Sequence, residues 1–375
     1  MKIIFDHQVF TQQSYGGISR YFVRLMQGLI TLGHQADVIA PFHRNRYLND
    51  LPPERVHGLQ LESFPPKTGR LMMVVNDQLS KLKLRGMYPD VLHETYYGAQ
   101  PLCPSAKGRV ITVYDIIHEK YRANFSTRDP AIRYKRLAID RADHVICISH
   151  STKSDLCSLF NVPEHKVSVV HLGFEKFNQR GNSSHTPITA PPQRPFLLYV
   201  GSRGGYKNFA RMLKAVASRS ALQGALDVVA FGGGAFNAEE LALVGTLGFA
   251  PQAVRQVGGG DEVLGTLYAA AAAFVYPSVY EGFGLPPLEA MAHNCPVVTS
   301  NSSSMPEVVG NAGEYFDPLD IEAQSDAICK VVFNAQRRSQ LIELGRQRLE
   351  MFSWDRCALE TQAVYQRVLR NKGLL

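Results

Sequence analysis

Two glutamates, Glu281 and Glu289, flank a glycine-containing turn in the second half of the chain. An apolar run over 269–276 leads into this turn, and Pro286-Pro287 opens a predicted helix after it. A helix N-terminus presents backbone N–H groups and a positive dipole end, which favour an anion such as phosphate. Glu289 can accept hydrogen bonds from both hydroxyls of a neighbouring ribose, and Glu281 would face the sugar beyond the phosphates. A simpler role for Glu289 is to complement the helix dipole, worth roughly 0.3–1 kcal/mol in the first turn.

Two cations, Arg203 and Lys207, lie in a glycine-rich turn that follows a predicted strand. A diphosphate gains negative charge when the bond to its sugar breaks, and fixed Arg and Lys charges can stabilise that charge without a metal. Two solvated charges in a surface loop are the alternative. The spacing matches neither G-x-G-x-x-G nor G-x-x-x-x-G-K-[ST], so neither a nicotinamide fold nor a P-loop is supported. We expect selectivity for the nucleotide base to depend on Ser202 and Val257-Gly258.

The first half of the chain carries two further candidate sites. Gly16-Gly17 separates the first predicted strand from the first helix, where glycines let a phosphate or an acceptor approach the backbone. A tight turn explains the pair equally well. Asp115 and His118 follow a β-rich run, at the edge where open α/β sheets place their ligands. Either side chain could contact the reacting sugar or position the acceptor, and a structural role for His118 is the alternative.

Short β-rich runs alternate with amphipathic stretches along the chain, which favours parallel strands connected by helices. Helices are predicted over 18–32 and 354–369, where apolar residues recur at helical spacing. The strands predicted in the first half are Lys2–Phe5, Ala36–Ala40, Val91–His93, Arg109–Tyr114, His144–Ile148 and Val167–His171. Those predicted in the second half are Phe196–Gly201, Leu226–Gly232, Phe274–Pro277 and Val297–Ser300.

Residues 178–195 are rich in Ser, Thr, Pro, Gln and Gly and lack apolar periodicity, so we interpret them as a linker. The 375 residues suffice for two hydrophobic cores. We therefore expect one Rossmann-like domain over 1–177 and a second over 196–353. The terminal helix, 354–375, would either pack locally or cross back to the first domain.

The composition is that of a globular protein, with 45% hydrophobic and 19% charged residues. No apolar run approaches the roughly 20 residues that span a bilayer, and the start of the chain resembles a strand rather than a signal peptide. We therefore expect a cytoplasmic protein. Six scattered cysteines without a C-x-x-C pair are expected to be free thiols rather than zinc ligands.

The net charge of +7 is concentrated in the first half, where residues 1–175 hold 22 basic and 16 acidic side chains, a difference of +6. This excess suits an anionic partner, such as a phosphorylated lipid carrier or a membrane surface. Nucleic acid ranks lowest because the sequence carries no nucleic-acid-binding motif. Segment 67–86 alternates basic and apolar residues, so it is either a domain helix with a solvated basic face or a helix that docks on an anionic membrane.

Together these motifs resemble the retaining, GT-B-fold glycosyltransferases of family 4. The resemblance is strongest over 196–318, where Glu281–Glu289 forms an E-x7-E motif, and it continues through Pro296–Ser300 and Met305–Gly310. Arg203 with Lys207, and the Gly16-Gly17 turn, extend it over most of the chain. The first half is similar to the subgroup that builds bacterial surface polysaccharides, including O-antigen mannosyl- and rhamnosyltransferases. The resemblance implies an α/β architecture of two Rossmann-like domains whose parallel sheets face an interdomain cleft.

The resemblance also implies roles for individual residues. Arg203 and Lys207 would grip the diphosphate, and Glu289 would bind the ribose. Glu281 and the backbone of Phe283-Gly284-Leu285 would hold the donor sugar, and Gly16-Gly17 would touch the diphosphate and the acceptor. Tyr114-Asp115 stands where the family usually has His-Asp, and His118 follows three residues later.

The implied activity is transfer of a hexose, such as mannose or the deoxyhexose rhamnose, from a nucleoside diphosphate-sugar. The donor would be GDP-linked, such as GDP-mannose, and the acceptor a glycan, either an oligosaccharide or one linked to undecaprenyl diphosphate, in lipopolysaccharide synthesis. In this family the leaving phosphate takes the acceptor proton, with retention of configuration, no protein nucleophile and neither metal nor cofactor. The alternatives are a GT-B-type sugar-nucleotide epimerase and a non-catalytic sugar-nucleotide-binding protein.

Overall fold

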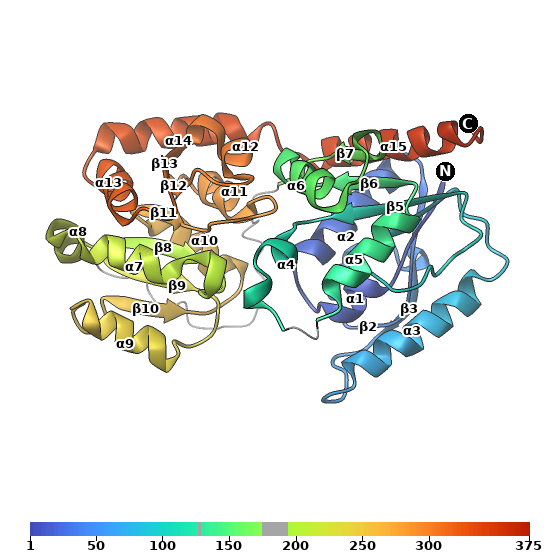
Figure 1. The fold of residues 1–375 in the computed structure, drawn as a ribbon, viewed down its shortest axis with the longest axis horizontal. Coiled ribbons are helices and arrows are strands. Elements are labelled where there is room, and N and C mark those ends of the chain that lie inside the picture. The colour runs from blue at the N-terminus through green and yellow to red at the C-terminus, as the bar shows by residue number, and fades with distance from the viewer. Residues whose placement is uncertain (127–128, 175–193) are drawn as a thin grey trace. The chain divides into compact units, whose positions relative to one another are not determined.

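The computed structural model describes residues 1–126, 129–174 and 194–375, and contacts within it cluster into two compact units. The first unit comprises Met1–Gly173 and Phe352–Leu375, and the second comprises Phe174–Met351. Each unit has its own parallel sheet covered by helices (Figure 1). Residues 178–193 of the predicted linker lie outside the described residues.

The first unit is built on a seven-stranded sheet in the order β3-β2-β1-β4-β5-β6-β7, with every pair parallel. Chain order reverses between β1 and β4, so the loops after these two strands diverge at the carboxyl edge of the sheet. The strands are β1 (Lys2–Phe5), β2 (Gln35–His43), β3 (Val56–Gln60), β4 (Val91–Glu94), β5 (Gly108–Val113), β6 (His144–Cys147) and β7 (Val167–Val169).

Helices cover this sheet because each turns an apolar stripe toward it. The buried stripe of α2 includes Phe22, Leu25 and Leu29, as its helical spacing predicts. The terminal helix α15 packs on α2 and belongs to the first unit. The helices are α1 (Gln8–Gln12), α2 (Gly17–Thr31), α3 (Gly69–Leu84), α4 (Ile117–Lys120), α5 (Ala131–Arg141), α6 (His150–Phe160) and α15 (Trp354–Asn371).

The second unit has a six-stranded parallel sheet in the order β10-β9-β8-β11-β12-β13, and its chain order reverses between β8 and β11. Its strands are β8 (Phe196–Val200), β9 (Asp227–Phe231), β10 (Val254–Val257), β11 (Ala273–Tyr276), β12 (Val297–Ser300) and β13 (Gly313–Phe316). Its helices are α7 (Phe209–Ala217), α8 (Ser220–Ala225), α9 (Ala238–Thr246), α10 (Asp261–Ala270), α11 (Leu285–Ala292), α12 (Met305–Val309), α13 (Ile321–Val332) and α14 (Ala335–Leu349).

These elements confirm the predicted α/β architecture. Each predicted strand is present within two residues of its expected ends, except that β2 continues three residues beyond the predicted end at Ala40. Strands β3, β10 and β13 were not predicted. All six cysteines are free, as expected. Within the described residues, no helix has the length and apolar character required to cross a bilayer.

Candidate active site

The carboxyl edge of the second sheet brings two of the predicted site residues together. Lys207 lies in the loop after β8 and Glu281 in the loop after β11, the two strands between which chain order reverses. Their side chains form an ion pair, with Lys207 Nζ 2.7 Å from Glu281 Oε1. The exposed fractions of these side chains are only 17% and 10%, so solvent screens the pair weakly. This edge is where open α/β sheets hold their ligands.

Hydrogen bonds from neighbouring loops fix both partners of this ion pair. The Val279 amide donates to the Tyr206 carbonyl at 2.8 Å, which joins the loop of Glu281 to the loop of Lys207. The Glu281 amide donates to Ser303 Oγ at 2.8 Å, and Ser304 Oγ donates to the Glu281 carbonyl at 2.9 Å. The backbone around the carboxylate is thus held from two sides before any ligand binds.

Two tyrosine rings lie close to the Lys207 ammonium group of the ion pair. Lys207 Nζ lies 5.3 Å from the centre of the Tyr206 ring and 5.8 Å from that of Tyr276, within cation–π range. Burial raises the pKa of Tyr276 well above its usual value, and the neighbouring Glu281 charge raises it further. Tyr276 is therefore a neutral hydroxyl at physiological pH, and Lys207 supplies positive charge to a largely dry surface.

Arg203 lies in the loop after β8, and its side chain is bound to α9 and to the loop after β9. Its guanidinium donates to both carboxylate oxygens of Glu240, at 2.7 and 3.2 Å, and to the Gly232 and Ala235 carbonyls. This arginine lowers the pKa of the Glu240 carboxyl. A β-carbon at Gly233 would lie 2.6 Å from Arg203 Nη1, so only glycine lets the arginine pack this closely. The contacts favour a role for Arg203 in shaping the loop after β9.

Glu289 lies on α11, which begins at Leu285 after Gly284. The glutamate is therefore the fifth residue of the helix, and the suggestion that it lies in the first turn was wrong. Its carboxylate is 9% exposed and accepts a hydrogen bond from the Tyr268 hydroxyl at 3.3 Å. Pro286 and Pro287 have no N–H group, so the start of α11 offers fewer backbone donors to an anion than an ordinary helix N-terminus does.

The remaining predicted residues of the second unit lie on its loops. Ser202 offers its carbonyl to the Tyr199 hydroxyl, and the Val257 carbonyl accepts from Gly232 at 3.0 Å. The loop Phe283-Gly284-Leu285 joins the Glu281 segment to α11, and Ser304 Oγ bonds the Phe283 carbonyl at 2.6 Å. Gly258 follows directly on the end of β10.

Gly16 and Gly17 lie in the first unit, where Gly16 precedes α2 and Gly17 is its first residue. The side chain of Gln13 folds over this helix start, and its Oε1 accepts the Ser19 amide at 3.3 Å. A β-carbon at Gly16 would lie 2.3 Å from that oxygen. The glycine therefore makes room for a side chain that caps the helix, which fits a turn-forming role as well as a ligand contact.

Asp115 and His118 follow β5 in the first unit, as predicted, but their side chains contact different residues. Asp115 Oδ1 accepts the Ile117 amide at 3.1 Å, so its carboxylate caps the start of α4. The His118 ring stacks on Phe125 at 4.0 Å, and its Nε2 lies 3.6 Å from Asp129 Oδ2. His118 keeps 22% of its side chain exposed and available to a ligand.

Comparison with known proteins identifies the family. A model of glycosyl transferases group 1 matches residues 183–348, and a model of glycosyltransferase family 4 matches residues 15–175. The chain belongs to the GT-B glycosyltransferases of family 4. It is 28% identical to O-antigen chain mannosyltransferase B of Escherichia coli, over 98% of this chain and 100% of that one.

Two further comparisons agree with this assignment. This glycosyltransferase is 28% identical to the O-antigen chain mannosyltransferase RfbU of Salmonella typhimurium, over 60% of this chain and 61% of that one. Its fold matches that of Anabaena Alr3699/HepE, solved with UDP and glucose, with a TM-score of 0.71 and 16% identity. That match covers 98% of this chain and 99% of the other, and at this identity it shows the fold.

Two groups near the site of this glycosyltransferase escaped the sequence analysis. Glu240 is one, although the spacing from Asn237 to Glu240 marks a helix start, and the structure has that capping box on α9. The pattern places the helix but does not reveal that the carboxylate also binds an arginine. Ser303 and Ser304 are the other group, and a serine run after a strand carries no distinguishing signal.

Proposed function

We propose that this glycosyltransferase moves a hexose, mannose or a deoxyhexose such as rhamnose, from a GDP-linked sugar to a lipid-linked or oligosaccharide acceptor in surface polysaccharide synthesis. The reaction would proceed with retention of configuration and without a metal. The observation that carries the proposal is the ion pair of Lys207 with Glu281 at the reversal point of the second sheet. The two mannosyltransferase relatives support mannose as the first sugar to test.

The chemistry follows from the charges at this edge. An acceptor hydroxyl oxygen attacks the anomeric carbon while the bond from that carbon to the diphosphate oxygen breaks. The leaving diphosphate takes the bonding electron pair, and the Lys207 ammonium stabilises the added negative charge. A phosphate oxygen of the leaving group accepts the hydroxyl proton from the acceptor. Glu281 binds hydroxyls of the donor sugar, and Glu289 binds those of the ribose.

The test measures release of free nucleoside diphosphate, first with and then without a mannoside acceptor. Thermal shift against GDP, UDP, ADP and dTDP selects the nucleotide beforehand. We expect acceptor-dependent release by the native chain and a loss of turnover in Lys207→Ala of about 10²–10³-fold, as for removal of one preorganised donor to a developing charge. Lys214→Ala, a charge on the neighbouring helix α7, is the matched control and should keep its activity. Native turnover in Lys207→Ala would refute the assignment.

The same assay separates the two alternatives. A sugar-nucleotide epimerase would release or convert nucleotide without an acceptor, and a non-catalytic binding protein would release none. An epimerase also needs acid and base carboxylates that the sequence does not identify. Lys207, by contrast, is suited to stabilise a departing diphosphate, which simple binding does not require.

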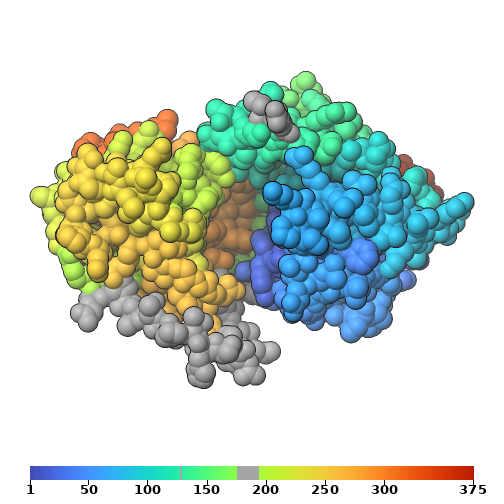
Figure 2. Space-filling model, turned by 90° about the horizontal axis from the view of Figure 1, so that it is seen from below, coloured from blue at the N-terminus to red at the C-terminus, as the bar shows by residue number. Residues whose placement is uncertain are grey.

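We further propose that α3 docks this enzyme on an anionic membrane. Its outer surface exposes Leu71, Val74 and Leu82, at 60%, 55% and 65%. In Figure 2 the light-blue surface of this segment faces the viewer and is open to solvent. Basic side chains accompany this apolar stripe, each worth roughly 1 kcal/mol near an anionic surface. They are Arg70, Lys81, Lys83 and Arg85.

Co-sedimentation with vesicles of phosphatidylglycerol and phosphatidylcholine tests the docking proposal. Leu71→Ser with Leu82→Ser should weaken binding, as should neutralisation of Lys81, Lys83 and Arg85. Leu241→Ser changes a leucine of the second unit with a similar exposure, 57%, and should bind as the native chain does. Equal vesicle binding by all variants would exclude the helix as the docking surface.

A further inference from the structure

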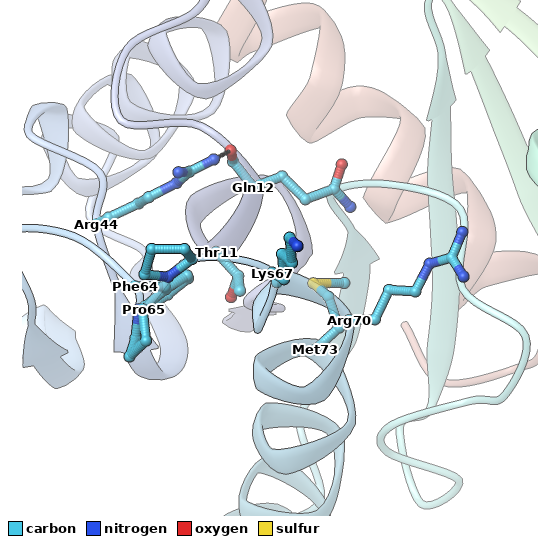
Figure 3. Close-up of a pocket in the computed structure, with 10 residues that line it drawn as sticks. Thr11, Gln12, Arg44, Phe64, Pro65, Lys67, Arg70 and Met73 are labelled. Atoms are coloured by element: carbon cyan, nitrogen blue, oxygen red, sulfur yellow. Dashed lines mark hydrogen bonds between the residues drawn. The ribbon is translucent and has the colours of Figure 1, made fainter.

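A cavity lies wholly within the first unit. It has a volume of about 520 Å³ and opens between α1, the end of β2 and the segment before α3. Figure 3 shows Thr11 and Gln12 on one side, and Arg44, Phe64, Lys67 and Arg70 around the rest. We call it the α1–α3 pocket. Because Thr11 and Arg44 follow shortly after β1 and β2, the pocket stands at the carboxyl edge of the first sheet.

The lining of the α1–α3 pocket is positively charged. Three of its ten lining residues are cations, and within the described part of the chain none is acidic. The side chains of Lys67 and Arg70 form no hydrogen bond or ion pair with any described residue. Uncompensated charges at a concave surface attract an anion, since the curvature keeps water from screening them fully.

Arg44 is the fixed member of this group. Its guanidinium donates to the Gln12 carbonyl and lies over the Phe64 ring, 5.8 Å from the ring centre. Arg44 Nε is buried and has no hydrogen-bond partner among the described residues. A buried N–H without an acceptor is costly, roughly 1–3 kcal/mol, so this donor favours a ligand that brings one.

Lys67 occupies a backbone conformation that lysine rarely adopts, with a φ of 64°. For a residue other than glycine this conformation costs on the order of 1–3 kcal/mol, and such strain clusters at binding sites. Figure 3 shows Lys67 between Arg44 and Arg70, with the Arg44 side chain extending toward Gln12 and that of Arg70 extending away from the other two. The three charges are therefore spread along the pocket, which suits an extended anion with several oxygens better than a single carboxylate.

We propose that the α1–α3 pocket binds the diphosphate of the sugar acceptor. This inference rests on the proposed transferase activity, because it assigns the acceptor of that reaction. The location supports it, since α3 begins at the pocket and its first turns carry the exposed Leu71 and Val74. A lipid tail attached to the diphosphate would find an apolar surface directly beside the charged one.

The decisive variant is Lys67→Asn, because asparagine tolerates a positive φ and removes the charge without adding strain. Arg133→Gln is the matched control, since it removes one exposed positive charge from α5 of the same unit at a residue that does not line the pocket. Inorganic diphosphate is titrated by calorimetry onto the full chain saturated with its nucleoside diphosphate, so that the donor site is filled. We expect Lys67→Asn to weaken diphosphate binding about 10-fold, the value of one charge-assisted contact, and Arg133→Gln to bind as the native chain does.

Kinetics with three acceptors extends the test. One acceptor is a mannoside on a short alkyl diphosphate, the second carries the same diphosphate on a polyprenyl chain in micelles, and the third is the methyl mannoside. Lys67→Asn should raise KM about 10-fold for both diphosphates and leave the methyl mannoside unchanged. An increase confined to the micellar acceptor would overturn the proposal, because the charge would then serve the lipid surface.

Two other results would also overturn it. Equal affinity of the native chain and Lys67→Asn for inorganic diphosphate is one. Loss of binding to phosphatidylglycerol vesicles with diphosphate affinity unchanged is the other, because the charges would then contact a bilayer. Failure of the proposed transferase activity looks different, since the native chain would then act on none of the three acceptors while the calorimetric titration still reports on the pocket.

Discussion

Replacing Glu281 by glutamine should strengthen the binding of a free nucleoside diphosphate. In the native chain Lys207 is paired with Glu281 at 2.7 Å, so a diphosphate must compete with this carboxylate for the ammonium group. Glutamine keeps the shape and removes the competing charge. A free nucleoside diphosphate lacks the transferred hexose, so it loses nothing that Glu281 would contribute to binding that sugar.

The magnitude follows from the burial of the ion pair. Side chains exposed by 17% and 10% form a pair stronger than a surface salt bridge, whose value is about 0–1 kcal/mol. A hydrogen bond to a charged group contributes about 1.5–3 kcal/mol, and the glutamine amide retains part of it. We therefore expect a gain of about 1–2 kcal/mol, which is a 5- to 30-fold lower Kd for the diphosphate.

Calorimetric titration of the nucleotide selected by thermal shift measures this change at constant ionic strength. Glu350→Gln removes an exposed carboxylate of the same unit and should leave the Kd unchanged. Turnover of Glu281→Gln with the complete sugar donor should fall, because the contact to the donor sugar is lost. Weaker or equal binding of the diphosphate by Glu281→Gln would refute the view that Lys207 is exchanged between carboxylate and phosphate.

Three further predictions concern single residues. Glu289→Gln should weaken ribonucleotide binding by about 1–2 kcal/mol and leave a 2′,3′-dideoxynucleotide unaffected, because the ribose hydroxyls are the only groups of the nucleotide proposed to contact this carboxylate. Gly284→Ala should lower the free energy of unfolding by about 1–3 kcal/mol, since its φ is 120° and the new β-carbon would lie 2.5 Å from Met305 Cε. Gly224→Ala in α8, where no atom lies within 4 Å, should instead be neutral or stabilise by about 0.5–1 kcal/mol, and urea unfolding compares the two. Burial lowers the pKa of His93 to about 3, so between about pH 6.5 and that value the unfolded chain binds a proton that the folded chain does not. The free energy of unfolding should therefore fall as pH falls, with His93 contributing up to roughly 1.4 kcal/mol per pH unit. His93→Gln should make the free energy of unfolding less dependent on pH, as measured by urea titrations at several pH values.

The three strands that the sequence did not reveal share one physical property. Strands β3, β10 and β13 all lie at sheet edges. An edge strand is covered less completely than a central one, so its sequence need not be a continuous apolar run. The letters VHGLQ in β3 and VRQV in β10 show this mixture of polar and apolar residues. Central strands such as β8 and β11 are buried on both faces and were therefore recognisable.

The candidate site could be predicted residue by residue but not as a set of contacts. Lys207 and Glu281 each follow a recognisable strand, yet 74 residues separate them. Their pairing depends on β8 and β11 being neighbours, which is a property of strand order rather than of local pattern. The same limit applies to Arg203, whose partner Glu240 lies 37 residues away on a helix of a different crossover.

The two cations after β8 differ in how readily a ligand can engage them, and this difference follows from their partners. Arg203 donates to a carboxylate and to backbone carbonyls of one glycine-rich loop, so withdrawing it would break several hydrogen bonds at once. In the proposed reaction Lys207 would exchange a single carboxylate for a phosphate, and the Tyr206 and Tyr276 rings lie within cation–π range of its charge. A diphosphate should therefore engage Lys207 directly and depend on Arg203 through the shape of the loop. It follows that Lys207→Ala should act mainly on turnover, whereas Arg203→Ala should lower the free energy of unfolding as well.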